Sequence, residues 1–209
     1  MTLVKRPYDA SSRRARAQHT HDRVVAAARA RFLTSGFAAT KVQQVAADTG
    51  VSVEYVYKRF GSKAGLVRAV VERALEGTAP VPAESRSDAL ASAKASTLVR
   101  GWGRLAAEVA PEVAPLLLLV REAAVQDSKV AALATELDDS RLERMTHNAQ
   151  RLVGTGELRD GVEVDDACDV LWTFSSPELY DLLVVRRGWD AGRYGDFVAR
   201  GITGALLTR

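Results

Sequence analysis

The sequence holds a single cysteine, Cys168, in 209 residues. A lone cysteine excludes an intrachain disulfide framework and any metal or redox motif built on paired cysteines. Charged residues interrupt the chain so often that no uncharged stretch approaches the roughly 20 residues of a transmembrane helix. The first residues carry charge where a secretory signal needs its apolar segment, so we expect a cytoplasmic protein.

Side chains for catalysis or metal binding are also scarce. His19 and His21 are too few for a metal site, and we expect both to be exposed to solvent. His147 and Cys168 have no partner at a catalytic spacing, and the sequence shows no set of nucleophile, base and oxyanion donors. We therefore predict no enzyme activity, no cofactor and no metal site.

The charge of the chain is unevenly distributed. Residues 1–62 contain 11 Lys and Arg against 4 Asp and Glu, a net charge of +7, whereas residues 63–209 contain 18 and 22, a net charge of −4. This asymmetry indicates that the N-terminal part meets a polyanion. A basic tail that only improves solubility is the alternative.

Nearly every segment has apolar residues at helical spacing, and no segment alternates as a strand does. The sequence thus predicts an all-α fold. Thr40 and Gln43 have the form of a capping box, and Ser52 is the expected N-cap of the third helix. Gly50 and Gly61 stop helices, and Pro177 should kink or divide its helix. The expected helices are 19–35, 40–49, 52–59, 62–76, 87–109, 112–126, 128–153, 163–185 and 193–208.

Residues 40–60 have the spacing of a helix-turn-helix motif. Ala46 is small where two helices cross, Gly50 makes the tight turn, and Val56 fills the junction between the helices. On the second helix of the motif, Glu54 and Lys58 face away from Val56. A short helix with a polar outer face on a small helical core suits the major groove of DNA.

The segment from Arg23 to Leu66 resembles the DNA-binding domain of the tetracycline-repressor (TetR) family of bacterial regulators. The matching residues are Phe32, Gly36, Thr40, Val42, Val45, Ala46, Gly50, Val51, Ser52, Tyr57, Phe60, Ser62, Lys63 and Leu66. The segment 175–197 resembles one common near the C-terminus of such proteins. The resemblance implies an N-terminal helix-turn-helix domain and a C-terminal helical domain for ligand binding and dimerisation.

The family's roles carry over to individual positions. Thr40, Tyr57 and Lys63 are expected to bind phosphates, and Lys58 lies on the outer polar face. Tyr55 stands where family members more often have Thr, and Glu54 can either accept from cytosine or only favour the helix N-terminus. The candidates for base or groove contact are Gln43, Ser52, Val53, Glu54 and Tyr55.

The expected domains are a flexible basic arm over 1–18, the helix-turn-helix domain over 19–77, a hinge over 78–87 and the C-terminal domain over 88–209. The hinge is placed at two prolines without apolar periodicity. The arm either follows DNA or is a disordered tail. Its basic residues are Lys5, Arg6, Arg13, Arg14 and Arg16.

The resemblance implies an effector cavity in the C-terminal domain, and its aromatic side chains suit an apolar effector. The same side chains can instead be ordinary core. The residues expected to line the cavity are Trp102, Leu117, Val120, Arg121, Trp172 and Phe174.

Apolar stripes on the last two helices indicate a homodimer, as the resemblance also implies, although a role in the core alone is the alternative. Two recognition helices about 34 Å apart can read a palindrome, which one copy cannot. The expected interface residues are Ala167, Val170, Leu171, Phe197, Ile202, Ala205 and Leu206.

These observations predict a dimeric, ligand-responsive transcriptional regulator, and specifically a repressor that an effector releases from a palindromic operator. Two alternatives stay open. One is an architectural DNA-binding protein whose C-terminal domain only dimerises, and the other is an all-α enzyme with an attached DNA-binding module.

Overall fold

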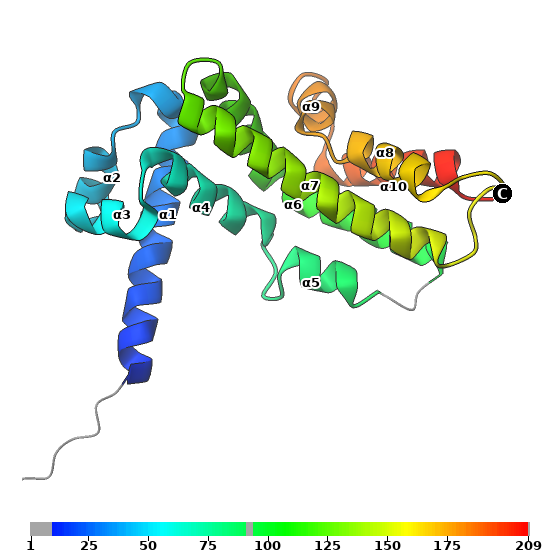
Figure 1. Ribbon diagram of the computed structural model, residues 1–209, viewed down its shortest axis with the longest axis horizontal. Coiled ribbons are helices and arrows are strands. Elements are labelled where there is room, and N and C mark those ends of the chain that lie inside the picture. The colour runs from blue at the N-terminus through cyan, green and yellow to red at the C-terminus, as the bar shows by residue number, and fades with distance from the viewer. Residues whose placement is uncertain (1–9, 91–93, 209) are drawn as a thin grey trace, which may run out of the picture. The chain divides into compact units, whose positions relative to one another are not determined.

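The computed structural model describes residues 10–90 and 94–208, and its regular elements there are helical (Figure 1). One antiparallel bridge joins Leu158 to Leu207. The predicted all-α fold is confirmed. The helices are α1 (Ala10–Ala39), α2 (Val42–Thr49), α3 (Val53–Phe60), α4 (Lys63–Leu75), α5 (Ala83–Asp88), α6 (Ala95–Ala124), α7 (Ser128–Val153), α8 (Val164–Phe174), α9 (Pro177–Tyr180), the π-helix η1 (Asp181–Val185) and α10 (Ala191–Leu206).

The chain divides into two compact units, residues 1–70 and 71–209. The division falls inside α4, which continues from one unit into the other. In the first unit, α1 to α3 and the first part of α4 bury a small apolar core around Phe32, Val45 and Val56. This core holds the two short helices in place, because isolated helices of their length are unstable in water.

The first helix is longer than the sequence predicted. It begins at Ala10, so residues 10–18 of the expected arm are helical, while Lys5 and Arg6 lie outside the described residues. Gly36 interrupts the helix with φ 78° and ψ 172°, close to the predicted end. A side chain would strain this left-handed backbone, which explains glycine at the position.

The segment predicted as a hinge, 78–87, contains most of α5. The side chain of Arg86 forms two hydrogen bonds with Glu108, of 2.8 and 2.7 Å. Trp102 Nε1 donates to Ser87 Oγ at 2.9 Å. The segment with two prolines and no apolar periodicity is therefore largely a short helix that polar contacts hold against α6. The domain boundaries predicted at this segment stay a prediction.

The predicted break between the expected helices 87–109 and 112–126, which contains Pro111, is wrong. Pro111 and Pro115 both lie inside the single helix α6, which has 30 residues. A proline inside a helix costs about 3 kcal/mol. Apolar side chains of α6 are buried on both sides of these prolines, and their burial offsets that cost. The buried residues of α6 include Leu98, Val99, Trp102, Val113, Ala114, Leu116 and Val120.

The predicted division at Pro177 is confirmed. Helix α8 ends at Phe174, Ser176 accepts a hydrogen bond from the Leu179 amide, and Pro177 is the first residue of α9. This is the position in a helix where a missing N–H costs little. The helical path then continues through η1 to Val185.

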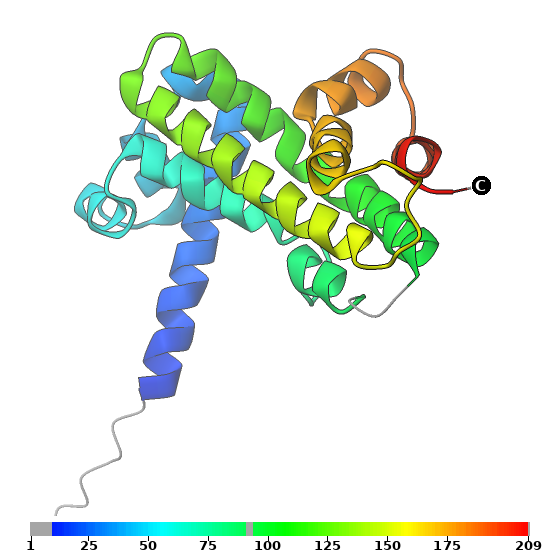
Figure 2. The same ribbon diagram turned by 45° about the vertical axis from the view of Figure 1, so that its right-hand side comes forward.

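The second unit is a helical bundle in which α6 lies beside α7 and α10 crosses α6, as Figures 1 and 2 show. The crossing depends on glycine, because a Cβ on Gly103 would lie only 2.6 Å from the carbonyl oxygen of Gly195. Around it, Trp102, Tyr194 and Ile202 are buried in one apolar core. Helix α5 packs against α6 at one side of the unit.

Candidate DNA-binding face

Helices α2 and α3 are joined by a tight turn at Gly50. Its φ of 66° and ψ of 24° are left-handed, as the sequence predicted for a glycine that ends a helix. The Val51 amide donates to the Ala46 carbonyl at 3.1 Å and closes the turn. Ala46 and Val56 are both nearly inaccessible to solvent. The two helices therefore form the helix-turn-helix that the spacing predicted.

The caps of the two helices differ from one another. Ser52 Oγ accepts from the Tyr55 amide at 3.0 Å and caps α3, as predicted. At α2 the predicted capping box of Thr40 and Gln43 is wrong by one residue, because Lys41 is the N-cap and its amide donates to Gln44 Oε1 at 3.0 Å. The Gln43 side chain is therefore not used by the cap and is exposed.

Thr40 is buried, with 2% of its surface exposed. Its hydroxyl donates to the carbonyl oxygen of Gly36 at 2.8 Å and so ties the kink of α1 to the start of α2. The structure thus shows a local role for this hydroxyl. Its expected contact with a phosphate stays a prediction.

The other predicted residues lie on or beside α3. Tyr57 is 45% exposed, which is unusual for a large aromatic side chain and suits contact with a phosphate. Val53 and Tyr55 are half-buried on the flanks of the helix. The predicted residues that are exposed are Gln43, Ser52, Glu54, Tyr57 and Lys58.

Lys63, at the start of α4, is held in place by its neighbours. Its Nζ donates to the Ala38 carbonyl oxygen at 3.3 Å and lies 4.1 Å from the centre of the Phe37 ring. The ammonium group is thus held beside α1. A phosphate contact at Lys63 would be made by a side chain that is already ordered, which reduces its entropic cost.

Side-chain contacts join helix α1 to the helix-turn-helix motif. Arg31 pairs with Asp48 on α2, with one hydrogen bond of 2.7 Å, and this contact lowers the pKa of the Asp48 carboxyl. The rings of His21 and Phe60 stack with centroids 5.2 Å apart. His21 is therefore partly covered, whereas His19 is exposed as predicted.

Basic side chains extend this face beyond the predicted set. Lys41 and Arg59 are exposed at the start of α2 and the end of α3. Their place in the motif, next to Thr40 and Lys58, was the signal that sequence reasoning overlooked. Arg13, Arg14 and Arg16 are exposed on the first turns of α1, so three basic residues of the expected arm are carried by a helix.

The residues predicted to line an effector cavity have other neighbours in the structure. Trp102 and Val120 are buried in the core. Arg121 pairs with Asp138 at 2.9 Å and with Glu178, and the guanidinium of Arg141 lies 3.3 Å from the centre of the Trp172 ring. Leu117 and Phe174 are half-buried. An effector cavity at these residues stays a prediction.

The residues predicted for the dimer interface fall into two groups. Four of them are buried within a single copy: Ala167, Leu171, Ile202 and Leu206. Val170 and Phe197 are half-buried and Ala205 is exposed, so these three are accessible to a second copy. The stripes on the last helices thus serve the core of one chain as well as any interface.

The fold and the motif define the class of protein, a helix-turn-helix DNA-binding transcription regulator. Residues 24–70 match the family of bacterial regulatory proteins of the tetR family. They form a tetR-family domain, and the resemblance seen in the sequence is confirmed.

Solved structures share the fold of nearly the whole chain. SmeT in complex with triclosan is 19% identical, with a TM-score of 0.71 over 91% of this chain and 93% of SmeT. NalD, the secondary repressor of the MexAB-OprM multidrug efflux pump in Pseudomonas aeruginosa, is 18% identical, with a TM-score of 0.61 over 92% of this chain and 98% of NalD. A regulator from Saccharomonospora viridis in complex with choline is 15% identical, with a TM-score of 0.64 over 92% of this chain and 100% of that regulator.

No curated protein matches the chain in sequence. Among residues 10–90 and 94–208, no helix has both the length and the apolar character needed to cross a membrane. In the same residues, no three His, Cys, Asp or Glu side chains are grouped as a metal site requires.

Proposed function

We propose that this protein is a ligand-responsive transcriptional repressor of the cytoplasm that binds a palindromic operator as a homodimer. The observation that carries the proposal is α3, a capped helix with exposed Glu54, Tyr57 and Lys58 in a unit of net positive charge. Such a helix fits the major groove, where base edges can be distinguished.

Each side chain has a proposed role on the DNA. Lys58, Tyr57 and Lys63 bind phosphates and set the orientation of the domain, while Glu54, Gln43 and Tyr55 reach base edges or the groove walls. A single helix of eight residues contacts few base pairs. Two copies placed about 34 Å apart read two half-sites, which is why the proposal includes a dimer.

The second unit is proposed to bind the effector. SmeT and the Saccharomonospora viridis regulator, which share the fold, have structures with triclosan and with choline. An effector weakens operator binding only if it binds the DNA-free conformation more tightly than the DNA-bound one. Operator DNA must then weaken effector binding by the same factor.

The experiment is a titration of duplex DNA, selected from a random library by this protein, at several salt concentrations. We expect steep salt dependence, and Lys58→Ala should reduce the slope of log K against log salt by about one on every sequence. The control is Lys129→Ala, an exposed lysine on α7, which should leave the slope unchanged. Equal slopes for the wild type and Lys58→Ala would remove Lys58 from the residues that contact phosphates.

The same titration separates the alternatives. Selection of no preferred duplex would favour the architectural DNA-binding protein, because its affinity comes from the phosphates alone. Glu54→Ala should change which bases are preferred if its carboxylate reads cytosine, and should leave the preference intact if it only stabilises the helix N-terminus.

A further inference from the structure

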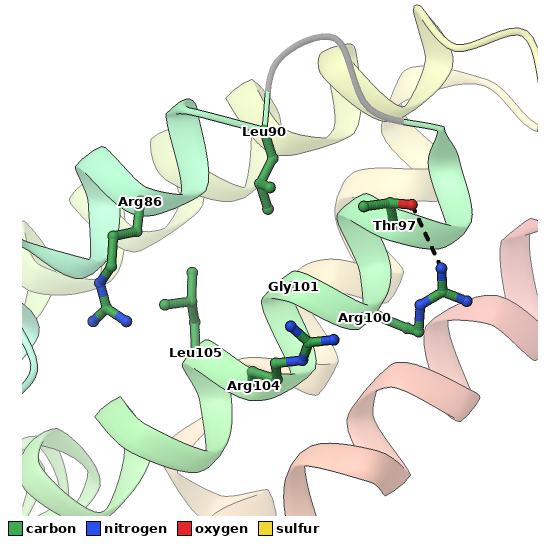
Figure 3. A pocket seen from close by; sticks show the side chains of 7 residues that line it. All are labelled: Arg86, Leu90, Thr97, Arg100, Gly101, Arg104 and Leu105. Carbon is green, nitrogen blue, oxygen red and sulfur yellow. Dashed lines mark hydrogen bonds between the residues drawn. The ribbon is translucent and has the colours of Figure 1, made fainter. Parts of the chain in front are cut away.

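The second unit has an open cleft of about 260 Å³ between the end of α5 and the N-terminal half of α6 (Figure 3). Leu90 and Leu105 point toward one another across it, and the basic side chains stand around them. The lining residues are Arg86, Leu90, Thr97, Arg100, Gly101, Arg104 and Leu105.

The charge of this cleft is strongly positive. Of the seven described residues that line it, three are arginines and none is acidic. Arg86 is already bound to Glu108 through two hydrogen bonds, so one carboxylate offsets one of the three guanidinium groups. Two positive charges remain beside an apolar surface.

The other two arginines are available to a ligand. Arg100 has one weak contact, from its Nη2 to Thr97 Oγ1 at 3.5 Å. Within the described part of the chain, Arg104 has no hydrogen bond or ion pair. Both arginines also line a neighbouring cleft of about 230 Å³ between α6 and α10, where Asp196 is the one acidic residue among the described lining residues. An ion pair between Asp196 and either arginine does not form.

We infer that the cleft binds a small organic anion, with its carboxylate or phosphate group on Arg100 and Arg104 and its apolar body between Leu90 and Leu105. Planar guanidinium groups bind such anions through paired hydrogen bonds. The volume is slightly below that of a typical drug-sized site, so the ligand is small. This inference rests on the proposed function, since it names the chemical class of the effector.

The cleft is connected to the segment that leaves α4. Glu108 Oε1 accepts hydrogen bonds from the amides of Thr78, at 2.8 Å, and Ala79, at 3.2 Å, as well as from Arg86. Arg86 lines the same cleft, so an anion held by Arg100 and Arg104 also attracts its guanidinium group and competes with Glu108 for it. Binding therefore loosens the contact that fixes residues 78 and 79, which follow the helix shared by both units.

The test uses the full-length protein with benzoate and phenyl phosphate as probes and neutral benzamide as the matched uncharged control. Ionic strength is held constant with chloride, because salt alone weakens DNA binding. We expect both anions to raise the melting temperature in a saturable way and benzamide to leave it unchanged. We also expect saturating anion to weaken binding to the selected duplex by about 5- to 150-fold.

Two variants locate the effect. Arg104→Gln should weaken anion binding at least about tenfold, the loss expected for a charge-assisted hydrogen bond. Arg104 is exposed, so the variant should fold normally. The matched control is Arg187→Gln, an exposed arginine outside the cleft, which should bind anions as the wild type does.

Each outcome is decisive. No saturable stabilisation by either anion, or equal anion affinity in Arg104→Gln and the wild type, overturns the inference. Stabilisation without any effect on DNA keeps the anion site and overturns the link through Arg86. The anion site and the proposed DNA-binding function can fail separately. A protein that binds the selected duplex but neither anion retains the proposed DNA-binding function and lacks only the anion site.

Discussion

Ser52 links the sequence motif to the position of the recognition helix. Its hydroxyl oxygen accepts the hydrogen bond of the Tyr55 amide, one of the amides at a helix start that have no partner within the helix. Replacing it with Ala should lower the free energy of unfolding by about 1 kcal/mol. Urea denaturation measures this loss.

The control is Ser52→Asn, because asparagine caps helices as well as serine does. It should retain the stability of the wild type. If Ser52→Ala and Ser52→Asn were equally stable, the cap at Ser52 would contribute nothing to the first unit.

The carboxyl of Glu108 has a lowered pKa because of hydrogen bonds from residues distant in the sequence. Hydrogen bonds from Arg86 are the largest cause that lowers the pKa of its carboxyl from 4.5 to about 2, with the amides of Thr78 and Ala79 adding to them and burial opposing. A carboxyl whose pKa is lowered by folding stabilises the folded state above its unfolded pKa. That contribution is lost as the pH falls toward about 2.

We therefore expect Glu108→Gln to be less stable than the wild type at neutral pH, with the difference shrinking as the pH falls from 4.5 to about 2. Urea denaturation across this range measures it. Glu143→Gln, on α7, is the control and should leave the stability unchanged, since the Glu143 side chain forms no hydrogen bond or ion pair with another described residue. A difference that stays constant over the range would show that Glu108 does not titrate as described.

At the scale of helices, the crossing of α6 and α10 depends on two small residues. Gly103→Ala should destabilise the protein by about 1–3 kcal/mol, because the new methyl group would meet the backbone of Gly195. The matched control is Gly204→Ala on α10, where nothing lies within 4 Å of the added Cβ. That change should stabilise the helix by about 0.5–1 kcal/mol. Thermal denaturation shows whether Gly103→Ala lowers the stability and Gly204→Ala raises it.

The two predicted proline breaks also belong to this scale. Pro177 divides a helix because Ser176 offers a cap just before it. Pro111 has no such cap and lies within a helix whose apolar face is buried before and after it. Sequence alone gives the local cost of each proline, whereas the burial that offsets this cost depends on which helix lies opposite.

At the scale of the whole molecule, the buried and accessible parts of the last helices change how the proposed dimer is tested. Ile202 is buried in its own unit, so a charge there would unfold the chain and would report nothing about the interface. Ala205 is exposed on the same helix. We expect Ala205→Glu to remain folded and to become monomeric, as sedimentation velocity can show.

Thr203→Glu is the control for this prediction. Thr203 is exposed on α10 about 200° around the helix from Ala205, so it faces away from the proposed interface. It should sediment as the wild type does. A dimer that persists in Ala205→Glu would place the interface on another surface.

The sequence by itself determined the all-α fold, the helix-turn-helix and the residues on the outer face of α3. These depend on contacts between residues close in the chain: the spacing of Ala46, Gly50 and Val56, a left-handed glycine and a serine cap. Such interactions have a fixed geometry, so spacing along the chain predicts them.

Only the tertiary structure decided that Trp102 and Ile202 are core, that Pro111 is inside a helix, and that Arg86, Arg100 and Arg104 surround one cleft. Arg86 and Glu108 are 22 residues apart, and no local pattern couples them. Their hydrogen bonds exist because packing brings α5 against α6. That packing minimises exposed apolar surface over the whole second unit, a sum over many residues that no segment of sequence contains.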